Sequence, residues 1–202
     1  MTEIASFDKL PHFVLASASP RRRELLAMVG LHFEVVTPGI EETIIGGEPP
    51  RQHAARLAQA KAHEVSSKRP DRWVLGADTI VVIGGQILGK PGDEDEAIRM
   101  LHGLSGRDHT VMTGFCICKN GAEQEAKDVI ESVVSVKDLS EREIRGYIKT
   151  GEPFDKAGAY AVQGIGMFMI ERISGSYANV VGLPVCEVVD ALERLGAIEL
   201  FK

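Results

Sequence analysis

The residue best suited to catalysis is Asp78, which interrupts a long apolar run from Trp73 to Ile83. A carboxylate inside an apolar strand needs a partner, a metal ion or a chemical task, because burying its charge alone is costly. Glu41 and Glu42 belong to a glycine-flanked loop and could meet Asp78. Carboxylates from separate elements can hold Mg²⁺, which prefers oxygen ligands and also binds phosphates. Asp78 could instead be a turn or edge aspartate bonded by backbone N–H groups, and Glu41 and Glu42 part of a solvated acidic loop.

Basic residues gather at the start of a predicted helix, where Arg21, Arg22 and Arg23 follow Ser19 and Pro20. Ser19 is a favourable N-cap, and Pro20 suits the first helical position. Three guanidinium groups at the positive end of the helix dipole weaken an isolated helix. Together with free N–H groups, however, they form a strong anion site. We therefore expect an external phosphate chain as their partner, in preference to a solvated cluster paired with acids elsewhere.

Lysines form the second basic group. Lys61 falls on the apolar stripe of a helix predicted from Arg51 to Ser66, so it either snorkels to solvent or directs its ammonium into an enclosed anion site. Lys90 ends the stretch Gly84–Lys90, which has the spacing of a P-loop. The hydroxyl residue and helix of a P-loop do not follow, and the first two glycines are typical of a hairpin turn. We interpret the match as accidental, although Lys90 can still bind phosphate. Lys156 is either another phosphate ligand or a surface charge.

The composition is that of an ordinary globular protein, with 202 residues, 44% hydrophobic content and a net charge of -6. The length suits one domain over residues 1–202, and the acidic balance argues against nucleic-acid binding. No apolar run approaches the roughly 20 residues of a membrane span, and the first ten residues lack a signal-peptide pattern, so we expect a cytoplasmic location and no membrane partner. The odd cysteine number fits a reducing compartment. We expect Cys116 and Cys118 to be small core residues, since the six histidines show no metal-binding spacing.

Alternating strand and helix patterns place these side chains. Strands are predicted at 13–16, 33–36, 73–83, 86–89, 107–118, 126–136, 159–163 and 167–172. Helices are predicted from Pro20 to about residue 30 and at 51–66, 93–104, 140–151 and 185–195, the fourth beginning with a capping box of Ser140 and Glu143, and a loop at 174–184. We expect one α/β domain with a mixed, long-stranded sheet and flanking helices. Two lobes around a cleft are expected, because long hairpins seldom fit a compact doubly wound sheet.

Short motifs across nearly the whole chain, from about Phe13 to Leu195, occur in the order found in the Maf family of nucleotide pyrophosphatases, which this sequence resembles. They are LASASPRR from Leu15, GIEE from Gly39, LAQAKA from Leu57, GADT from Gly76, GKP from Gly89, LSG from Leu104, DKAGAY from Asp155, QG from Gln163 and VGLP from Val181. The resemblance implies an α/β fold similar to that of inosine triphosphate pyrophosphatases. It also implies a homodimer that hydrolyses a nucleoside triphosphate to the monophosphate and pyrophosphate with a divalent cation, Mg²⁺ or Mn²⁺.

The resemblance also implies roles for individual residues. Asp78 matches the family's catalytic proton acceptor and would hold the metal ion together with Glu42. The remaining matched residues would bind the substrate, the basic ones through its triphosphate; they are Ser17, Arg21, Arg22, Lys61 and Lys90. These roles agree with the residue types, because phosphoryl chemistry of this kind needs positioning and charge stabilisation as pyrophosphate leaves.

Three positions resemble the branch of the family that acts on dTTP and UTP. They are Arg21, Thr79 and Gln163, where the branch acting on 7-methyl-GTP has tryptophan, glutamine and glutamate. A tryptophan could stack on a cationic methylated purine, whereas Arg21 would repel it. The Gln163 amide offers a donor and an acceptor, which suit the N–H and C=O edge of uracil and thymine.

Three alternatives remain at this stage. A P-loop-type phosphohydrolase would release orthophosphate instead of pyrophosphate. A 7-methyl-GTP pyrophosphatase would share the reaction but not the base. A nucleotide sensor that inhibits cell division would bind nucleotide with negligible turnover.

Overall fold

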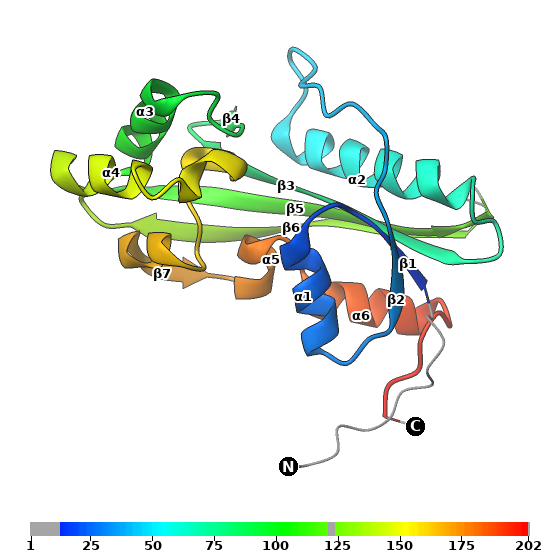
Figure 1. The fold of residues 1–202 in the computed structure, drawn as a ribbon. Coiled ribbons are helices and arrows are strands. Elements are labelled where there is room, and N and C mark those ends of the chain that lie inside the picture. The colour runs from blue at the N-terminus through cyan, green and yellow to red at the C-terminus, as the bar shows by residue number, and fades with distance from the viewer. Residues whose placement is uncertain (1–12, 121–123, 202) are drawn as a thin grey trace. The chain divides into compact units, whose positions relative to one another are not determined.

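The computed structural model describes residues 13–120 and 124–201, which form a mixed α/β fold (Figure 1). Seven strands form one sheet in the order β2-β1-β3-β5-β6-β7, with β4 paired to β3. This mixed sheet with flanking helices confirms the predicted fold class. The chain forms two compact units, which are described separately. Unit 1 contains Met1–Asp78, Thr113–Val129 and Gly182–Lys202, and unit 2 contains Thr79–Met112 and Ile130–Val181.

Unit 1 is built on parallel strands with helices on both faces (Figure 1). β1 lies between β2 and β3 and is parallel to both. Because crossovers between parallel strands are right-handed, this order sends α1 and α2 to opposite faces of the sheet. All four residues of β1 are buried, as expected for a strand covered on both faces. The elements are β1 (Phe13–Ala16), α1 (Pro20–Met28), β2 (Phe33–Val36), α2 (Pro50–Ser66), the first part of β3 (Trp73–Ile83), parts of β5 (Asp108–Lys119) and β6 (Gln124–Val136), and α6 (Val185–Arg194).

Helix α1 begins and ends as its sequence predicts. The Ser19 side chain accepts a hydrogen bond from the backbone N–H of Arg22, and Pro20 occupies the first turn. Gly30 follows the helix with a φ of 78°, the left-handed conformation that ends many helices. The start of α1, where the three arginines lie, is therefore fixed directly after the buried strand β1.

Two glycines allow α2 to approach the sheet closely. A Cβ atom on Gly76 of β3 would lie 2.4 Å from the Ala58 carbonyl oxygen, and one on Gly114 of β5 would lie 2.4 Å from that of Ala54. Ala62, one turn further along α2, lies 2.6 Å through its backbone nitrogen from the same Gly76 position. Only glycine fits such a backbone-to-backbone contact. The contact holds α2 directly over β3 at Gly76, which lies two residues before Asp78.

Unit 2 contains the β3–β4 hairpin, a helical pair and several short 3₁₀ turns. Gly84 and Gly85 both have positive φ, 56° and 80°, as a two-residue hairpin turn requires. The predicted capping box is confirmed, because Ser140 and Glu143 each bond the other's backbone N–H. Helices α3 and α4 contact each other. The elements are the rest of β3, β5 and β6, β4 (Gln86–Leu88), α3 (Glu94–Leu104), α4 (Glu141–Ile148), the 3₁₀ helices η2 (Glu152–Asp155), η3 (Ala157–Ala159) and η4 (Ile165–Met169), β7 (Ile170–Ser174) and α5 (Tyr177–Val181).

Two predictions for the last third of the chain are wrong and one is partly right. No strand forms at 159–163. Of the strand predicted at 167–172, the first half lies in η4 and the second half in β7, which begins at Ile170. Positive φ at Gly158, Ala159 and Gly164 turns the backbone repeatedly, which an extended strand does not allow. Glu152 accepts hydrogen bonds from the N–H groups of residues 165 and 166 and so holds the start of η4. The predicted loop at 174–184 contains the short helix α5.

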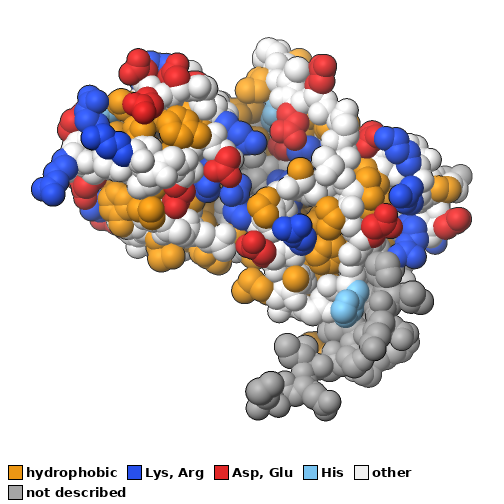
Figure 2. All heavy atoms as spheres, viewed as in Figure 1, with side chains coloured by type: hydrophobic (Ala, Val, Ile, Leu, Met, Phe, Trp, Pro, Cys, Tyr) orange, Lys and Arg blue, Asp and Glu red, His pale blue; other side chains and the backbone are white. Residues whose placement is uncertain are grey.

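The surface carries charges of both signs. Figure 2 shows acidic and basic side chains interspersed on the visible face, in keeping with the modest net charge of -6. Among the described residues, no helix is long and apolar enough to cross a membrane.

Candidate active site

The centre of the candidate site is a buried ammonium group between two carboxylates in unit 1. Lys61 Nζ lies 2.7 Å from Asp78 Oδ1 and 2.6 Å from Glu42 Oε1. The side chains of Lys61 and Asp78 are 6% and 7% exposed, whereas that of Glu42 is 54% exposed. Lys61 is therefore an enclosed cation and not a snorkelling one, and Asp78 is a buried strand residue and not a turn aspartate. The arrangement brings together a carboxylate of β3, a lysine of α2 and a carboxylate from the loop between β2 and α2.

Arg22 is held beside these groups by partners inside unit 1. Its Nε donates to the Gly182 carbonyl oxygen at 2.8 Å, and its Nη1 donates to Ser17 Oγ at 3.2 Å. Burial lowers the pKa of the Arg22 guanidinium, while the charges of Asp78 and Glu42 act in the opposite direction. These partners inside the chain are neutral oxygen atoms, so the expected phosphate partner of the arginines stays a prediction. The fixed guanidinium still places a positive charge at the start of α1.

Ser17 fixes the turn from β1 into α1. Its buried hydroxyl oxygen accepts hydrogen bonds from the Ser19 backbone N–H at 3.1 Å and from Arg22. Arg21 is half-buried in the first turn of α1, next to Arg22, and contributes to lowering the pKa of Arg22. Ser17, Arg21 and Arg22 thus lie at one helix N-terminus, as the sequence predicts.

A second ion cluster holds the loop that carries Glu42. Glu48 is bonded at Oε1 by Arg56 Nε at 2.6 Å, and at Oε2 by Arg56 Nη2 at 2.8 Å and His53 Nδ1 at 2.9 Å. Arg56 Nη2 also donates to the Thr43 carbonyl oxygen at 3.0 Å, one residue after Glu42. The hydrogen bonds from Arg56 are the main cause that lowers the pKa of Glu48 to about 2. Glu48 and Arg56 therefore anchor the loop to α2, which also carries Lys61.

Sequence reasoning missed Glu48, Arg56 and Gly182. Glu48 and Arg56 are eight residues apart and read as ordinary surface charges. A sequence signal did exist for Arg56. This residue directly precedes Leu57, which belongs to the apolar stripe of the helix, and Lys61 lies on the same stripe. Gly182 acts through its backbone carbonyl, which no residue type reveals.

The other predicted site residues lie outside this cluster or belong to unit 2. Glu41 is exposed, and the structure shows Glu42 as the loop carboxylate on Lys61. In unit 2, Lys90 is exposed after β4, Thr79 is half-buried in β3, and Gln163 is half-buried before η4. Their predicted roles stay predictions. Lys156 donates hydrogen bonds to the Glu152 carbonyl oxygen and to the carboxylate of Asp155.

Comparison with known proteins decides the family. The family model described as "Maf-like protein" matches residues 12–195, nearly the whole chain. The chain belongs to the Maf-like family. A dTTP/UTP pyrophosphatase of Geotalea uraniireducens (strain Rf4) is 53% identical over 188 residues, covering 93% of this chain and 97% of that protein. A protein of the same name from Syntrophotalea carbinolica (strain DSM 2380 / NBRC 103641 / GraBd1) is 54% identical over 191 residues, covering 93% and 86%.

The donor atoms of this Maf-like site fit a hard divalent cation. Asp78 and Glu42 offer carboxylate oxygens within reach of a single ammonium, and Mg²⁺ and Mn²⁺ prefer such oxygens. The formal charges of Asp78, Glu42, Lys61 and Arg22 sum to zero. Adding a divalent cation leaves an excess of two positive charges, which favours binding of an anion. The residue types of the site therefore fit a divalent cation together with an anionic ligand.

Proposed function

We propose that this protein hydrolyses dTTP and UTP to the nucleoside monophosphate and pyrophosphate, a house-cleaning role in nucleotide metabolism. The observation that carries the proposal is the buried Asp78–Lys61 pair with Glu42, in a chain about half identical to proteins named dTTP/UTP pyrophosphatase. A P-loop phosphohydrolase is not supported, because Gly84 and Gly85 form a hairpin turn and no helix follows Lys90 at once.

In the proposed reaction, Asp78 accepts the proton of the attacking water as pyrophosphate leaves. Lys61 and Arg22 stabilise negative charge that develops on the phosphates, and the N-terminus of α1 adds N–H donors and the positive end of its dipole. Glu42 and Asp78 would hold the divalent cation, Mg²⁺ or Mn²⁺, which would neutralise phosphate charge. Ser17 and Gly182 hold Arg22, and Glu48 with Arg56 anchors the loop of Glu42, so these groups are positioned before the substrate binds.

Substrate recognition is assigned from the family resemblance, with which the residue types agree. We propose that Ser17, Arg21 and Lys90 bind the substrate and that Arg21, Thr79 and Gln163 set the base preference. The amide of Gln163 can pair with the donor and acceptor edge of thymine and uracil, whereas cytosine would leave buried groups unpaired. A homodimer and a cytoplasmic location are also proposed, the first from the family resemblance and the second from the cysteine content.

A substrate panel tests this proposal. Pyrophosphate release should be fast with dTTP and UTP and slow with CTP, ATP and 7-methyl-GTP. Gln163→Glu should lower the specificity constant for dTTP, whereas Gln86→Glu, an exposed control on β4, should leave it unchanged. A specificity constant for 7-methyl-GTP above those for dTTP and UTP would overturn the assignment to this branch.

A further inference from the structure

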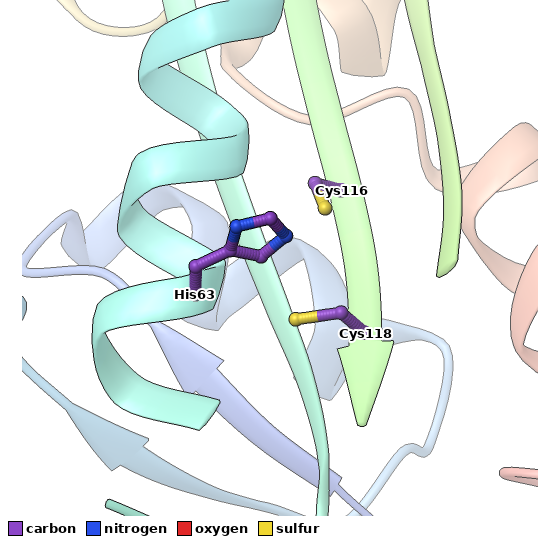
Figure 3. A group of neighbouring side chains, drawn as sticks. All are labelled: His63, Cys116 and Cys118. Carbon is purple, nitrogen blue, oxygen red and sulfur yellow. The ribbon is translucent and has the colours of Figure 1, made fainter. Parts of the chain in front are cut away.

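A group of metal-ligating side chains lies in unit 1, apart from the residues assigned to catalysis. One ring nitrogen of His63 and the sulfur atoms of Cys116 and Cys118 all lie within 4.8 Å of one another. Figure 3 shows the imidazole of His63, from α2, directed towards the two sulfur atoms on β5. Both thiols are fully buried, and the His63 side chain is 33% exposed. The cluster thus has two enclosed sulfur atoms and one side open to solvent.

The convergence follows from the fold. Cys116 and Cys118 are two residues apart in a strand, so their side chains point to the same face. That face is the one covered by α2, where Ala62 packs against both cysteines. His63 is the next residue of α2 and lies beside the contact. Sequence spacing alone does not reveal the group, because His63 and Cys116 lie 53 positions apart in the chain.

Glu125 of β6 supplies a fourth donor. Its Oε2 lies 2.6 Å from His63 Nε2 and accepts a hydrogen bond from the Cys116 thiol at 3.5 Å. Its Oε1 is paired with Lys127 at 2.7 Å, and Gln59 donates to both oxygens at 3.3 and 3.2 Å. These partners orient the carboxylate so that Oε2 faces the cluster.

We propose that His63, Cys116, Cys118 and Glu125 form a tetrahedral Zn²⁺ site that ties α2 to β5 and β6. Two thiolates, an imidazole and a carboxylate are the ligands that zinc takes, with bond lengths of about 2.0–2.3 Å. Such bonds require ligand atoms roughly 3.3–3.8 Å apart. The ligand atoms of His63, Cys116 and Cys118 already lie within 4.8 Å of one another, so small side-chain movements bring these three to that spacing. The Glu125 carboxylate, now bonded to His63 Nε2, must turn from this imidazole towards the metal ion. Metal binding would release the thiol protons. Lys127 balances the single negative charge left by Zn²⁺ with two thiolates and one carboxylate.

The zinc site is distinct from the proposed Mg²⁺ or Mn²⁺ site. Successive helix residues are about 100° apart, so Lys61 and His63 point to different sides of α2. The Asp78 site offers only carboxylate oxygens, which hard cations prefer, whereas thiolates select zinc and other softer ions. With four protein ligands, the zinc site is closed and structural, because no position remains for water or substrate.

Metal binding under reducing conditions tests the proposal directly. Metal-free protein, with its thiols kept reduced, is titrated with Zn²⁺ against a chromogenic chelator in excess Mg²⁺. We expect one Zn²⁺ per chain, a higher melting temperature, and, with Co²⁺ in place of Zn²⁺, thiolate-to-metal charge-transfer absorption with the visible bands of tetrahedral cobalt. Cys186→Ser, which changes the exposed cysteine on α6, is the matched control and should bind zinc as the parent does.

Ligand variants identify the site. Cys116→Ser with Cys118→Ser should abolish zinc binding and the charge-transfer absorption. His63→Gln and Glu125→Gln change less buried side chains, so they keep the test valid if the double variant fails to fold. Altering a residue that only contacts a ligand, such as Lys127, typically weakens metal binding about 10–100-fold. Each of these two ligand variants should weaken zinc binding by more than that. Absence of zinc binding by reduced parent protein, or unchanged binding in His63→Gln and Glu125→Gln, would overturn the proposal and leave a hydrogen-bonded thiol cluster.

Discussion

At the scale of single residues, one buried ammonium holds two carboxylates in place. Lys61 contacts Asp78 and Glu42 at hydrogen-bond distance, although these residues come from three separate elements. A carboxylate buried in an apolar strand needs such a partner, because burying its charge alone is costly. The ion pair with Lys61 therefore accounts for the buried position of Asp78.

Replacing Asp78 tests the proposed base. Asp78→Asn keeps the side-chain shape but removes the proton acceptor, so we expect kcat to fall by about 10²–10⁴-fold with the fold retained. Asp71→Asn, which changes an exposed aspartate just before β3, is the control and should leave kcat unchanged. Kinetics with dTTP and circular dichroism provide the two readouts. A folded Asp78→Asn enzyme with most of its activity would exclude Asp78 as the base.

Lys61 should contribute to substrate binding as well as to the position of Asp78. Lys61→Met should weaken binding of a non-hydrolysable dTTP analogue by about 1.5–3 kcal/mol, the contribution of a charged hydrogen bond. Equilibrium binding in the presence of Ca²⁺ measures this, with Lys68→Met, an exposed lysine just after α2, as the control. If Lys61→Met and the parent protein bind the analogue equally well, Lys61 does not bind the substrate and serves only to position the two carboxylates.

At the scale of elements, the position of the site depends on how α2 meets β3. Gly76 and Gly114 allow backbone contact with a stripe of alanines at 54, 58 and 62. Lys61 lies beside this stripe, so the depth of the contact determines whether its ammonium reaches Asp78. The loop after β2 is anchored to the same helix by Glu48 and Arg56, which brings Glu42 to Lys61.

Adding a methyl group at Gly76 should disturb this contact. In Gly76→Ala the new Cβ would lie 2.4 Å from the Ala58 carbonyl oxygen, so α2 must move away from the sheet. We expect a loss of about 1–3 kcal/mol in the free energy of unfolding, together with reduced kcat. Denaturant unfolding measures the first effect. Gly46→Ala, at a loop glycine with no neighbouring atom within 4 Å, should be close to neutral. Equal stability of both variants would show that α2 does not need this close approach.

The Glu48 cluster should make the stability of the protein depend on pH in the acid range. The folded protein holds the pKa of Glu48 at about 2, below its usual 4.5. Between these values the unfolded chain binds more protons, so stability falls as pH decreases through this window. Melting temperatures measured from pH 5 to 2 should fall less steeply in Glu48→Gln than in the parent, whereas the exposed Glu41→Gln should behave as the parent does. Identical slopes in Glu48→Gln and the parent would contradict the ion cluster.

How far the sequence predicts these elements depends on local signals. The caps at Ser19, Ser140 and Gly30 act within one turn, and the helices at 50–66 and 94–104 show clear apolar periodicity, so their predictions are confirmed. The region 157–169 failed because its apolar residues resemble a strand, whereas positive φ and the long-range bonds of Glu152 determine its shape. Asp78, Lys61 and Glu42 were predicted as site residues, but their direct contact was not, since it depends on packing between distant segments.

At the scale of the whole molecule, the parallel strands of unit 1 organise the candidate site. β1 ends at Ala16, directly before Ser17 and the turn into α1. In the adjacent β3, Gly76 pairs with Ala16, so Asp78 lies two residues beyond the end of β1. The helix terminus proposed to bind phosphate and the carboxylate proposed to act as the base therefore lie close together, beyond the carboxyl end of β1. This is the position where ligands commonly bind in open α/β sheets.

The central claim is that the protein removes pyrophosphate from a pyrimidine nucleoside triphosphate. The most direct measurement is product identification after incubation of the purified enzyme with dTTP and Mg²⁺ or Mn²⁺. We expect dTMP and pyrophosphate in equal amounts, neither dTDP nor orthophosphate as a primary product, and almost no product with Asp78→Asn. Formation of dTDP and orthophosphate, or binding of dTTP without turnover, would contradict the assignment.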